Sequence, residues 1–235
     1  ATFPYDHIHI NVPDTAAAAN WYEKNFGGKR ITEAPDRLMF GSTRFMFLKK
    51  ADAKPSAGGA IDHVGFSFAD LDAKVKEWEA AGIKITSPVR DVPGLFKLAF
   101  LEDPWGTRIE VVQDPELLGL HHLHLRNPNP DEGFAWLLDK FGGKKTQLKG
   151  RLDGIRYDAD GFSSVWILIQ KGEAEPRTVT PPGAGRSARM RRVCWSISSQ
   201  RLSMSLRNTT SASGDRIDHT PRSSSLLSSP GRQPT

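Results

Sequence analysis

AIDHVGFSF at residues 60–68 and DPWGTRIEVVQD at residues 103–114 enclose the stretch that decides the fold of this chain. Both segments are short and rich in β-branched and aromatic residues, which predicts strands. Between them, DLDAKVKEWEAAG at residues 70–82 repeats its apolar residues at helical spacing. His63 stands near the start of the first strand and Glu110 in the middle of the last one. A His and a Glu on two strands of one small unit are candidate ligands for a metal.

Two further copies of this unit flank the stretch. Residues 5–30 align with residues 120–145 at a constant offset of 115, and both copies contain the sequence FGGK. His7 in the first copy matches His122 in the last, and it also matches His63 at an offset of 56. A repeat of this length indicates a supersecondary unit that recurs along the chain.

Each copy predicts the order βαβββ: a strand, a helix that ends at a glycine, and three short strands. The fold class is therefore α+β. A unit of about 50–60 residues is too small to bury a good core alone, so we expect the units to pair.

The repeats divide the chain into three predicted parts. Residues 1–115 hold two units and form a first domain, and residues 116–185 hold a third unit of an incomplete second domain. A fourth copy begins as RRVCWSIS at residues 191–198, but the pattern then dissolves into serine and arginine. Residues 186–235 are therefore expected to be a degenerate, disordered tail. Translation in a shifted frame would explain its composition, and the coding DNA would test that hypothesis.

The charge of the chain is unevenly distributed. The net charge of +5 divides into +7 for residues 186–235 and −2 for residues 1–185. The body offers no basic face, so nucleic acid is not an expected partner. No apolar run is long enough for a membrane span, and the single cysteine, Cys194, excludes an intrachain disulfide. We expect a cytoplasmic protein, or alternatively an exported one whose signal peptide has been removed.

The tandem βαβββ units, with His in the first strand and a DPxGxxxE motif before the last, resemble the vicinal oxygen chelate superfamily. This superfamily includes glyoxalase I, extradiol dioxygenases, fosfomycin-resistance transferases and bleomycin-resistance proteins. The resemblance covers residues 5–113 well, covers residues 120–170 in part, and is lost in the tail. It implies that two units join edge to edge into an open, cupped mixed sheet around a metal.

The resemblance also implies a ligand set. Its first-strand positions carry over to His7 and His63, and its fourth-strand position carries over to Glu110. In the first unit, Met46 takes the place of that acid. Two imidazoles and one carboxylate favour Fe(II), with Mn(II) or Zn(II) as alternatives. His9 lies two positions after His7 on the same face, where we expect an acid–base group or an alternative ligand.

The implied function is that of a metal-dependent lyase or dioxygenase, whose small-molecule substrate chelates the metal through vicinal oxygens. The alternative is a metal-free small-molecule binding protein of the bleomycin-resistance type. Phe100 stands where the dioxygenase and fosfomycin branches place a catalytic tyrosine, ten residues before Glu110, and this argues against both specific activities. Phe100 and Met46 favour the binding protein, whereas the His, His, Glu set favours the enzyme.

The third unit also contains histidines, but we expect no second metal site from them. His121, His122 and His124 lie in its first strand, and Ile167 is predicted at the position of Glu110 in its last. Without a complete fourth unit, the third one has an unpaired sheet edge. It could dock on the first domain, pair with another chain as a homodimer, or fold only in part.

Overall fold

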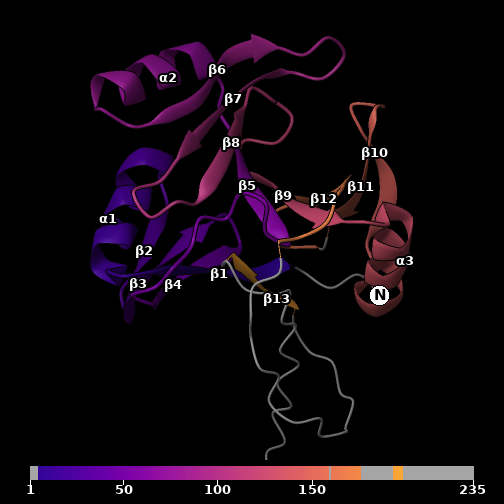
Figure 1. The fold of residues 1–235 in the computed structure, drawn as a ribbon, viewed down its shortest axis with the longest axis horizontal. Coiled ribbons are helices and arrows are strands. Elements are labelled where there is room, and N and C mark those ends of the chain that lie inside the picture. Colours follow the sequence, from indigo (N-terminus) through magenta and orange to yellow (C-terminus); the bar gives the residue numbers. More distant parts are fainter. Residues whose placement is uncertain (1–4, 159, 176–192, 198–235) are drawn as a thin grey trace, which may run out of the picture.

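The structure is a computed structural model that describes residues 5–158 and 160–175, and the course of the backbone at residues 193–197. Three βαβββ units follow one another, and a single strand follows the third (Figure 1). The predicted α+β class and the repeat are confirmed. The first unit comprises β1 (Tyr5–Val12), α1 (Thr15–Phe26), β2 (Lys29–Ile31), β3 (Ala34–Phe40) and β4 (Thr43–Lys49). The second comprises β5 (Ile61–Ser67), α2 (Leu71–Ala80), β6 (Ile85–Asp91), β7 (Lys97–Glu102) and β8 (Arg108–Val112). The third comprises β9 (Gly119–Asn127), α3 (Pro130–Phe141), β10 (Lys144–Leu148), β11 (Leu152–Tyr157) and β12 (Val165–Lys171), and the last strand is β13 (Val193–Ile197).

Local sequence fixes the ends of the helices. The Asp14 carboxylate accepts a hydrogen bond from the Ala17 backbone N–H at 3.0 Å, and Asp70 caps α2 in the same way. Side-chain acceptors of this kind satisfy N–H groups that the first helical turn leaves unpaired. Gly27 ends α1 with a φ of 73°, a left-handed conformation that favours glycine.

The units pair in an order that differs from the predicted one. One sheet has eight strands in the order β10-β11-β12-β9-β5-β8-β7-β6, so it joins the second and third units. The other has the order β13-β1-β4-β3-β2 and holds the first unit. The predicted pairing of the first and second units is therefore wrong, and the predicted division between residues 115 and 116 falls between two units that share a sheet.

The pairing follows from the edges that each unit leaves open. In every unit the first strand lies parallel to its own fourth strand and has one unpaired edge, which is a site for further strand pairing. β5 and β9 pair antiparallel along these edges. The open edge of β1 instead takes β13, in parallel orientation. Of the three predicted fates of the third unit, docking within the same chain is the one observed.

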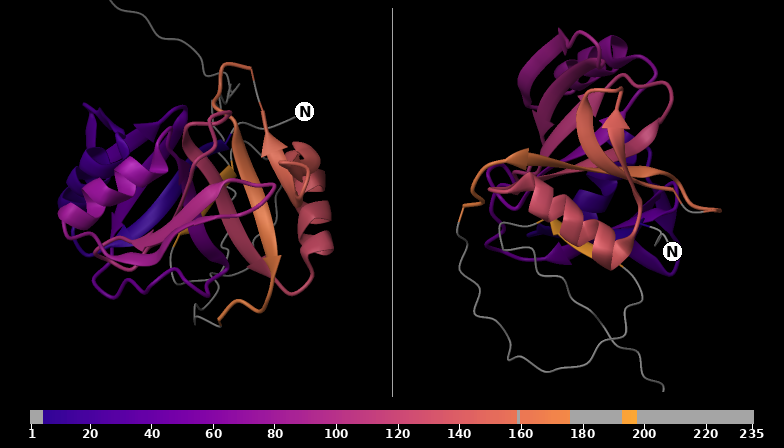
Figure 2. Two further views of the ribbon diagram at one scale, coloured as in Figure 1. Left: turned by 90° about the horizontal axis from the view of Figure 1, so that it is seen from above. Right: turned by 90° about the vertical axis from the view of Figure 1, so that its right-hand side faces the viewer.

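Two apolar clusters show that the larger sheet is curved. The main core combines residues of both sheets and all three helices, including Tyr22, Trp78 and Phe141. Figure 2 shows the ribbon from two further sides, with the helices packed beside the sheets. A second cluster lies on the other face of the larger sheet and contains Phe100 from β7 and Trp166 from β12. These strands are separated by β8, β5 and β9, so the sheet must curl for their side chains to meet. The expected cupped sheet is thus present.

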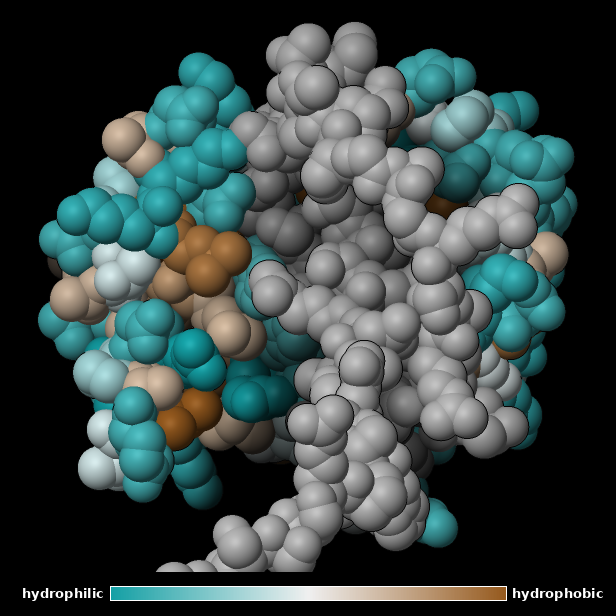
Figure 3. All heavy atoms as spheres, turned by 90° about the horizontal axis from the view of Figure 1, so that it is seen from below, coloured by the Kyte–Doolittle hydropathy of each residue, from teal (hydrophilic) through white to brown (hydrophobic). Residues whose placement is uncertain are grey.

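The predicted tail contributes one described strand, β13, which lies within residues 186–235. The expectation of disorder concerns residues that otherwise lie outside the described part of the chain. In the described part of the chain, no helix is long and apolar enough to cross a membrane. Figure 3 shows that the visible described surface is mainly hydrophilic, with separate hydrophobic spots.

Candidate metal centre

The centre of the cup is built by three adjacent strands, β8, β5 and β9. The register places Gly65 beside Glu110 on one side and beside His122 on the other. His63 lies opposite His124 in the same antiparallel pair. Because side chains alternate along a strand, His63 and Gly65 share the face of β5 that looks into the cup. The register therefore brings three imidazoles and a carboxylate to one spot.

Their polar atoms converge. His63, Glu110, His122 and His124 each offer one ligand atom, and these atoms all lie within 4.8 Å of one another. The Glu110 Oε2 atom lies 2.9 Å from His63 Nε2 and 3.2 Å from His122 Nε2. His124 Nδ1 lies 3.1 Å from His63 Nε2. The first three residues are buried and His124 is half-buried, so the group is largely screened from water.

The outer nitrogen of His63 is held by Asp62. The Nδ1 atom lies 2.7 Å from the Asp62 carboxylate, which is fully buried. Asp62 also accepts hydrogen bonds from Arg108 and Arg126, each at 2.8 Å, and from the Gly58 backbone N–H at 2.9 Å. A buried carboxylate needs such compensation. Asp62 therefore fixes the orientation of the His63 ring.

His122 has a different outer partner. Its Nδ1 atom lies 2.8 Å from Nδ1 of the fully buried His121, whose Nε2 atom lies 3.2 Å from an oxygen of Asp114. Lys149 binds the other Asp114 oxygen at 2.8 Å. Burial opposes the ionised form of Asp114, but the hydrogen bonds from His121 and Lys149 outweigh it and hold its pKa well below the usual range. A chain of hydrogen bonds thus runs from Asp114 to Glu110.

The four residues of the group differ in charge. Burial lowers the pKa of His122 to about 4 and that of His124 to about 3, so both imidazoles are neutral near pH 7. Burial also opposes charge on His63, but hydrogen bonds to Asp62 and Glu110 outweigh it and raise its pKa. Burial opposes ionisation of Glu110, yet His122 and His63 hold its pKa well below the usual value. Protonation is therefore favoured at His63 and opposed at His122 and His124, beside a carboxylate whose ionised form is stabilised.

Gly65 makes room for His122. A Cβ atom added at Gly65 would lie 2.1 Å from Cε1 and 2.2 Å from Nδ1 of the His122 ring. Such distances are far inside van der Waals contact, so only glycine permits the ring to lie across β5. The corresponding positions in the other units are His9 and His124, because each stands two residues after the histidine that aligns with His63.

His7 and His9 lie elsewhere. Both are in β1 of the smaller sheet, and among the described residues neither belongs to the group. His7 Nδ1 contacts the Asp6 carboxylate at 2.6 Å, and its ring centroid lies 4.8 Å from that of His9. The structure thus brings His63 and Glu110 together as predicted, but His122 and His124 accompany them in place of His7. The reason is the pairing of β5 with β9.

Strand register also tests the fourth-strand positions. Met46 pairs with His9 as Glu110 pairs with Gly65, so Met46 does stand in the place of the acid. In the third unit, Leu168 pairs with His124, and Leu168 rather than Ile167 is the counterpart of Glu110. The predicted register was off by one residue there, which places Ile167 in the core on the opposite face.

The role of His122 and His124 could have been found in the sequence. The alignment at an offset of 115 places His122 on His7 and His124 on His9, so the same motif that suggested His7 also marks the third unit. The alignment does not show which first strands pair with each other in the fold. Glu110 of the second unit lies beside the histidines of the third, so the acid of this group comes from a different unit than two of its histidines.

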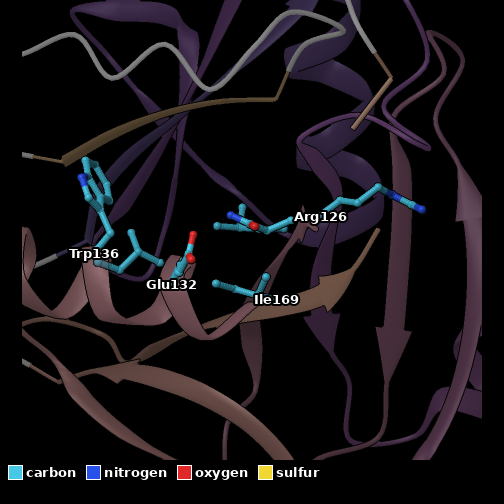
Figure 4. Close-up of a pocket in the computed structure, with 8 residues that line it drawn as sticks. Arg126, Glu132, Trp136 and Ile169 are labelled. Carbon is cyan, nitrogen blue, oxygen red and sulfur yellow. The ribbon is translucent and has the colours of Figure 1, made fainter. Parts of the chain in front are cut away.

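Two cavities border this region. One of about 280 Å³ opens beside His124 and is also lined by Gln147, Arg151 and Leu168. Another, of about 300 Å³, lies between α3 and strands β9 and β12 and contains none of the four residues. Figure 4 shows Glu132 on α3 near Ile169, with the Arg126 guanidinium directed away. Of these two cavities, the first borders the group, at His124.

Comparisons with known proteins agree with this architecture. Residues 5–111 match the model of the Glyoxalase/Bleomycin resistance protein/Dioxygenase superfamily. No curated protein sequence matches the chain. Among solved structures, glyoxalase I from Zea mays is 19% identical with a TM-score of 0.55, covering 72% of this chain and 67% of its own. A putative dioxygenase from Bacillus subtilis is 14% identical with a TM-score of 0.52, covering 73% of this chain and 66% of its own.

These structural likenesses concern the fold, and they extend beyond the part matched by the family model. The family resemblance inferred from the tandem units is confirmed. Residues 5–111 thus carry the similarity to the Glyoxalase/Bleomycin resistance protein/Dioxygenase superfamily that the tandem units predict.

Proposed function

We propose that the protein is a metal-dependent enzyme of this superfamily, with His63, Glu110 and His122 as ligands of a divalent ion. His124 is the fourth member of the centre and stands at the cavity. The observation that carries the proposal is the convergence of four donor atoms within 4.8 Å in a buried site. Burying three imidazoles and a carboxylate in an apolar cup costs free energy, and a bound metal ion would compensate that cost.

The donor set suits a first-row metal. Two atoms bonded to one ion at ~2.1 Å lie about 3.0 Å apart when their bonds are perpendicular. The separations of 2.9 Å and 3.2 Å from Glu110 to His63 and His122 match that arrangement. Neutral imidazoles with one carboxylate favour Fe(II), and Mn(II) or Zn(II) are alternatives. The outer nitrogens of His63 and His122 are already engaged, as is usual for ligating histidines.

The chemistry we propose is activation of a small molecule that presents two neighbouring oxygens. A bound divalent ion supplies Lewis-acid polarisation of those oxygens. His124, neutral near pH 7 and next to the cavity, is placed to orient the substrate there by a hydrogen bond. Phe100 and Trp166 form apolar walls that exclude water. These roles fit a lyase or a dioxygenase, the two reaction types that the family resemblance implies.

Metal analysis tests the proposal, and the chain offers a matched control. We expect purified full-length protein to bind about one equivalent of Fe(II), Mn(II) or Zn(II). His63→Ala should lose it, because the variant removes a donor atom from the group. His7→Ala removes a histidine at the same place in the first unit and should keep the metal. Equal metal content in both variants would contradict the proposal.

A second candidate function is metal-free binding of a small molecule, as in bleomycin-resistance proteins. Phe100 favours it, because its buried ring lies edge-on to His63, 5.3 Å between centroids, and offers no hydrogen-bond donor. Absence of stoichiometric metal from the wild-type protein would support this function instead. A cytoplasmic location and a homodimer stay predictions, which cell fractionation and light scattering would test.

A further inference from the structure

The residue before each first-strand histidine reveals a substitution within the repeat. Asp6 precedes His7 and Asp62 precedes His63, and each carboxylate contacts Nδ1 of its histidine, at 2.6 Å and 2.7 Å. In the third unit the corresponding residue is His121, and its Nδ1 atom contacts Nδ1 of His122 at 2.8 Å. An imidazole thus occupies the place of a carboxylate.

A carboxylate is present as the next hydrogen-bond partner, because His121 contacts Asp114. His121 Nε2 lies 3.2 Å from Oδ2 of Asp114, and both residues are buried. The other oxygen, Oδ1, accepts from Lys149 at 2.8 Å and from the Glu116 backbone N–H at 3.1 Å. Asp114 is therefore anchored with Oδ2 turned to His121.

The direction of the hydrogen bonds between His122, His121 and Asp114 follows from the proposed metal binding by His122. To bind a metal through Nε2, His122 must carry its proton on Nδ1 and donate it to His121 Nδ1. His121 then has its own proton on Nε2, which donates to Asp114. The two hydrogen bonds from His122 to His121 and from His121 to Asp114 are satisfied with both imidazoles neutral. The unprotonated His122 Nε2 atom then faces a Glu110 oxygen at 3.2 Å, and because both atoms are acceptors, a metal between them would satisfy both.

We propose that His121 and Asp114 are positioning residues, which relay the role of the missing carboxylate and fix the Nε2 lone pair of His122 toward the metal centre. The proposal rests on the proposed function, because it assigns His122 as a ligand. It also makes a claim about His121 in the metal-free chain, which can be tested separately.

Asp114→Asn tests the relay in the presence of metal. The amide can keep its oxygen on Lys149 and the Glu116 N–H only by turning its NH₂ group to His121. His121 Nε2 must then accept, so both protons in the relay reverse and His122 Nε2 is blocked. We expect Zn(II) affinity, measured by competition with a chelator, to fall about 10-fold.

His121→Asn separates this effect from general damage. The Asn oxygen can accept the His122 Nδ1–H, but the shorter side chain does not carry the chain of hydrogen bonds on to Asp114. We expect this variant to retain most of the Zn(II) affinity and Asp114→Asn to have no further effect in its background. Equal effects of Asp114→Asn in both backgrounds, or none in the wild type, would overturn the relay.

Nitrogen-15 NMR of the metal-free, full-length protein provides the independent measurement. We expect Nε2 of His121 to have the chemical shift of a protonated, pyrrole-type nitrogen. A pyridine-type shift would overturn the relay whether or not metal binds. If the wild type binds no Zn(II), the proposed function fails, and this spectrum alone decides the relay.

Discussion

The first and second units carry the same Asp–His pair, yet among the described residues it is the pair of the second unit that lies in the proposed metal centre. In both, the aspartate holds Nδ1 of the next histidine at nearly the same distance, 2.6 Å for His7 and 2.7 Å for His63. What differs is the neighbourhood. β5 lies between Glu110 on β8 and His122 on β9, whereas β1 lies between Met46 on β4 and a strand, VCWSI, that contains neither His nor acid.

The difference between the two units indicates that strand pairing supplies the remaining donors of the proposed metal centre. An Asp–His pair on a first strand supplies one oriented imidazole. The remaining donors come from the two strands that flank it, and one of these belongs to another unit. A chain with repeated units can therefore repeat the motif without repeating the site.

Removing the Glu110 carboxylate should have the largest effect on metal affinity. Glu110→Gln replaces the charged donor with a neutral amide beside His63 and His122, and we expect metal affinity to fall at least ~100-fold. Met46→Gln makes the same residue at the matching position of the first unit and should leave metal binding unchanged. Metal affinity measured by chelator competition checks both, and unaltered binding by Glu110→Gln would remove Glu110 from the centre.

Much of this comparison could be predicted from sequence, and the limit is physical. The repeat located the strands, His63, Glu110 and the substitution of the acid by Met46, because those features depend on spacing within a unit. The partner of β5 could not be predicted, because all three first strands present a similar open edge. The one-residue error at Ile167 has the same origin, since an alternating strand changes face when its register slips by one.

The close approach of the His122 ring to Gly65 could not be predicted from the sequence, because it depends on the pairing of β5 with β9. Gly65→Ala places a methyl group 2.1–2.6 Å from the His122 ring atoms, so the ring must move away from the centre. Overpacking of this kind costs about 1–3 kcal/mol of unfolding free energy, and metal binding should weaken with it. Chemical denaturation and metal titration measure the two effects.

Gly133→Ala is the matched control for that substitution. Its Cβ would lie 3.0 Å from Cδ1 of Ile169, the end of a flexible side chain, and alanine favours the helix α3. We expect a change in unfolding free energy within about 1 kcal/mol and unaltered metal affinity. If Gly65→Ala behaved like Gly133→Ala, His122 would not lie across β5 as described.

The two Asp–His pairs can be compared directly by the same substitution. Asp62→Asn weakens the hold on His63 Nδ1 and should reduce metal affinity about 10- to 100-fold. Asp6→Asn alters an equivalent hydrogen bond beside His7 and should leave the metal affinity unchanged. Chelator competition on both variants sharpens the assignment, and equal losses would show that His7 belongs to the centre after all.

The last prediction concerns pH and separates the histidines of β9 from His63. In the metal-free protein, burial lowers the pKa of His122 to about 4 and of His124 to about 3, against ~6.5 in the unfolded chain. Between pH 6.5 and 4.5 the unfolded state binds more protons at these two positions, so stability should fall as pH falls. The raised pKa of His63 acts in the opposite sense and above pH ~6.5, where its stabilisation is lost as pH rises.

Urea denaturation of the metal-free protein across pH 4.5–6.5 measures this effect, and we expect a loss of about 4 kcal/mol toward the acid end. The window lies above the range in which Glu110 and Asp62, whose pKa values are lowered, lose their contribution. His124→Gln removes one of the two groups and should make the pH dependence shallower by about 2 kcal/mol. A stability that stays constant over this window would mean that the β9 imidazoles are not buried as neutral groups, and the contrast between them and His63 would fail.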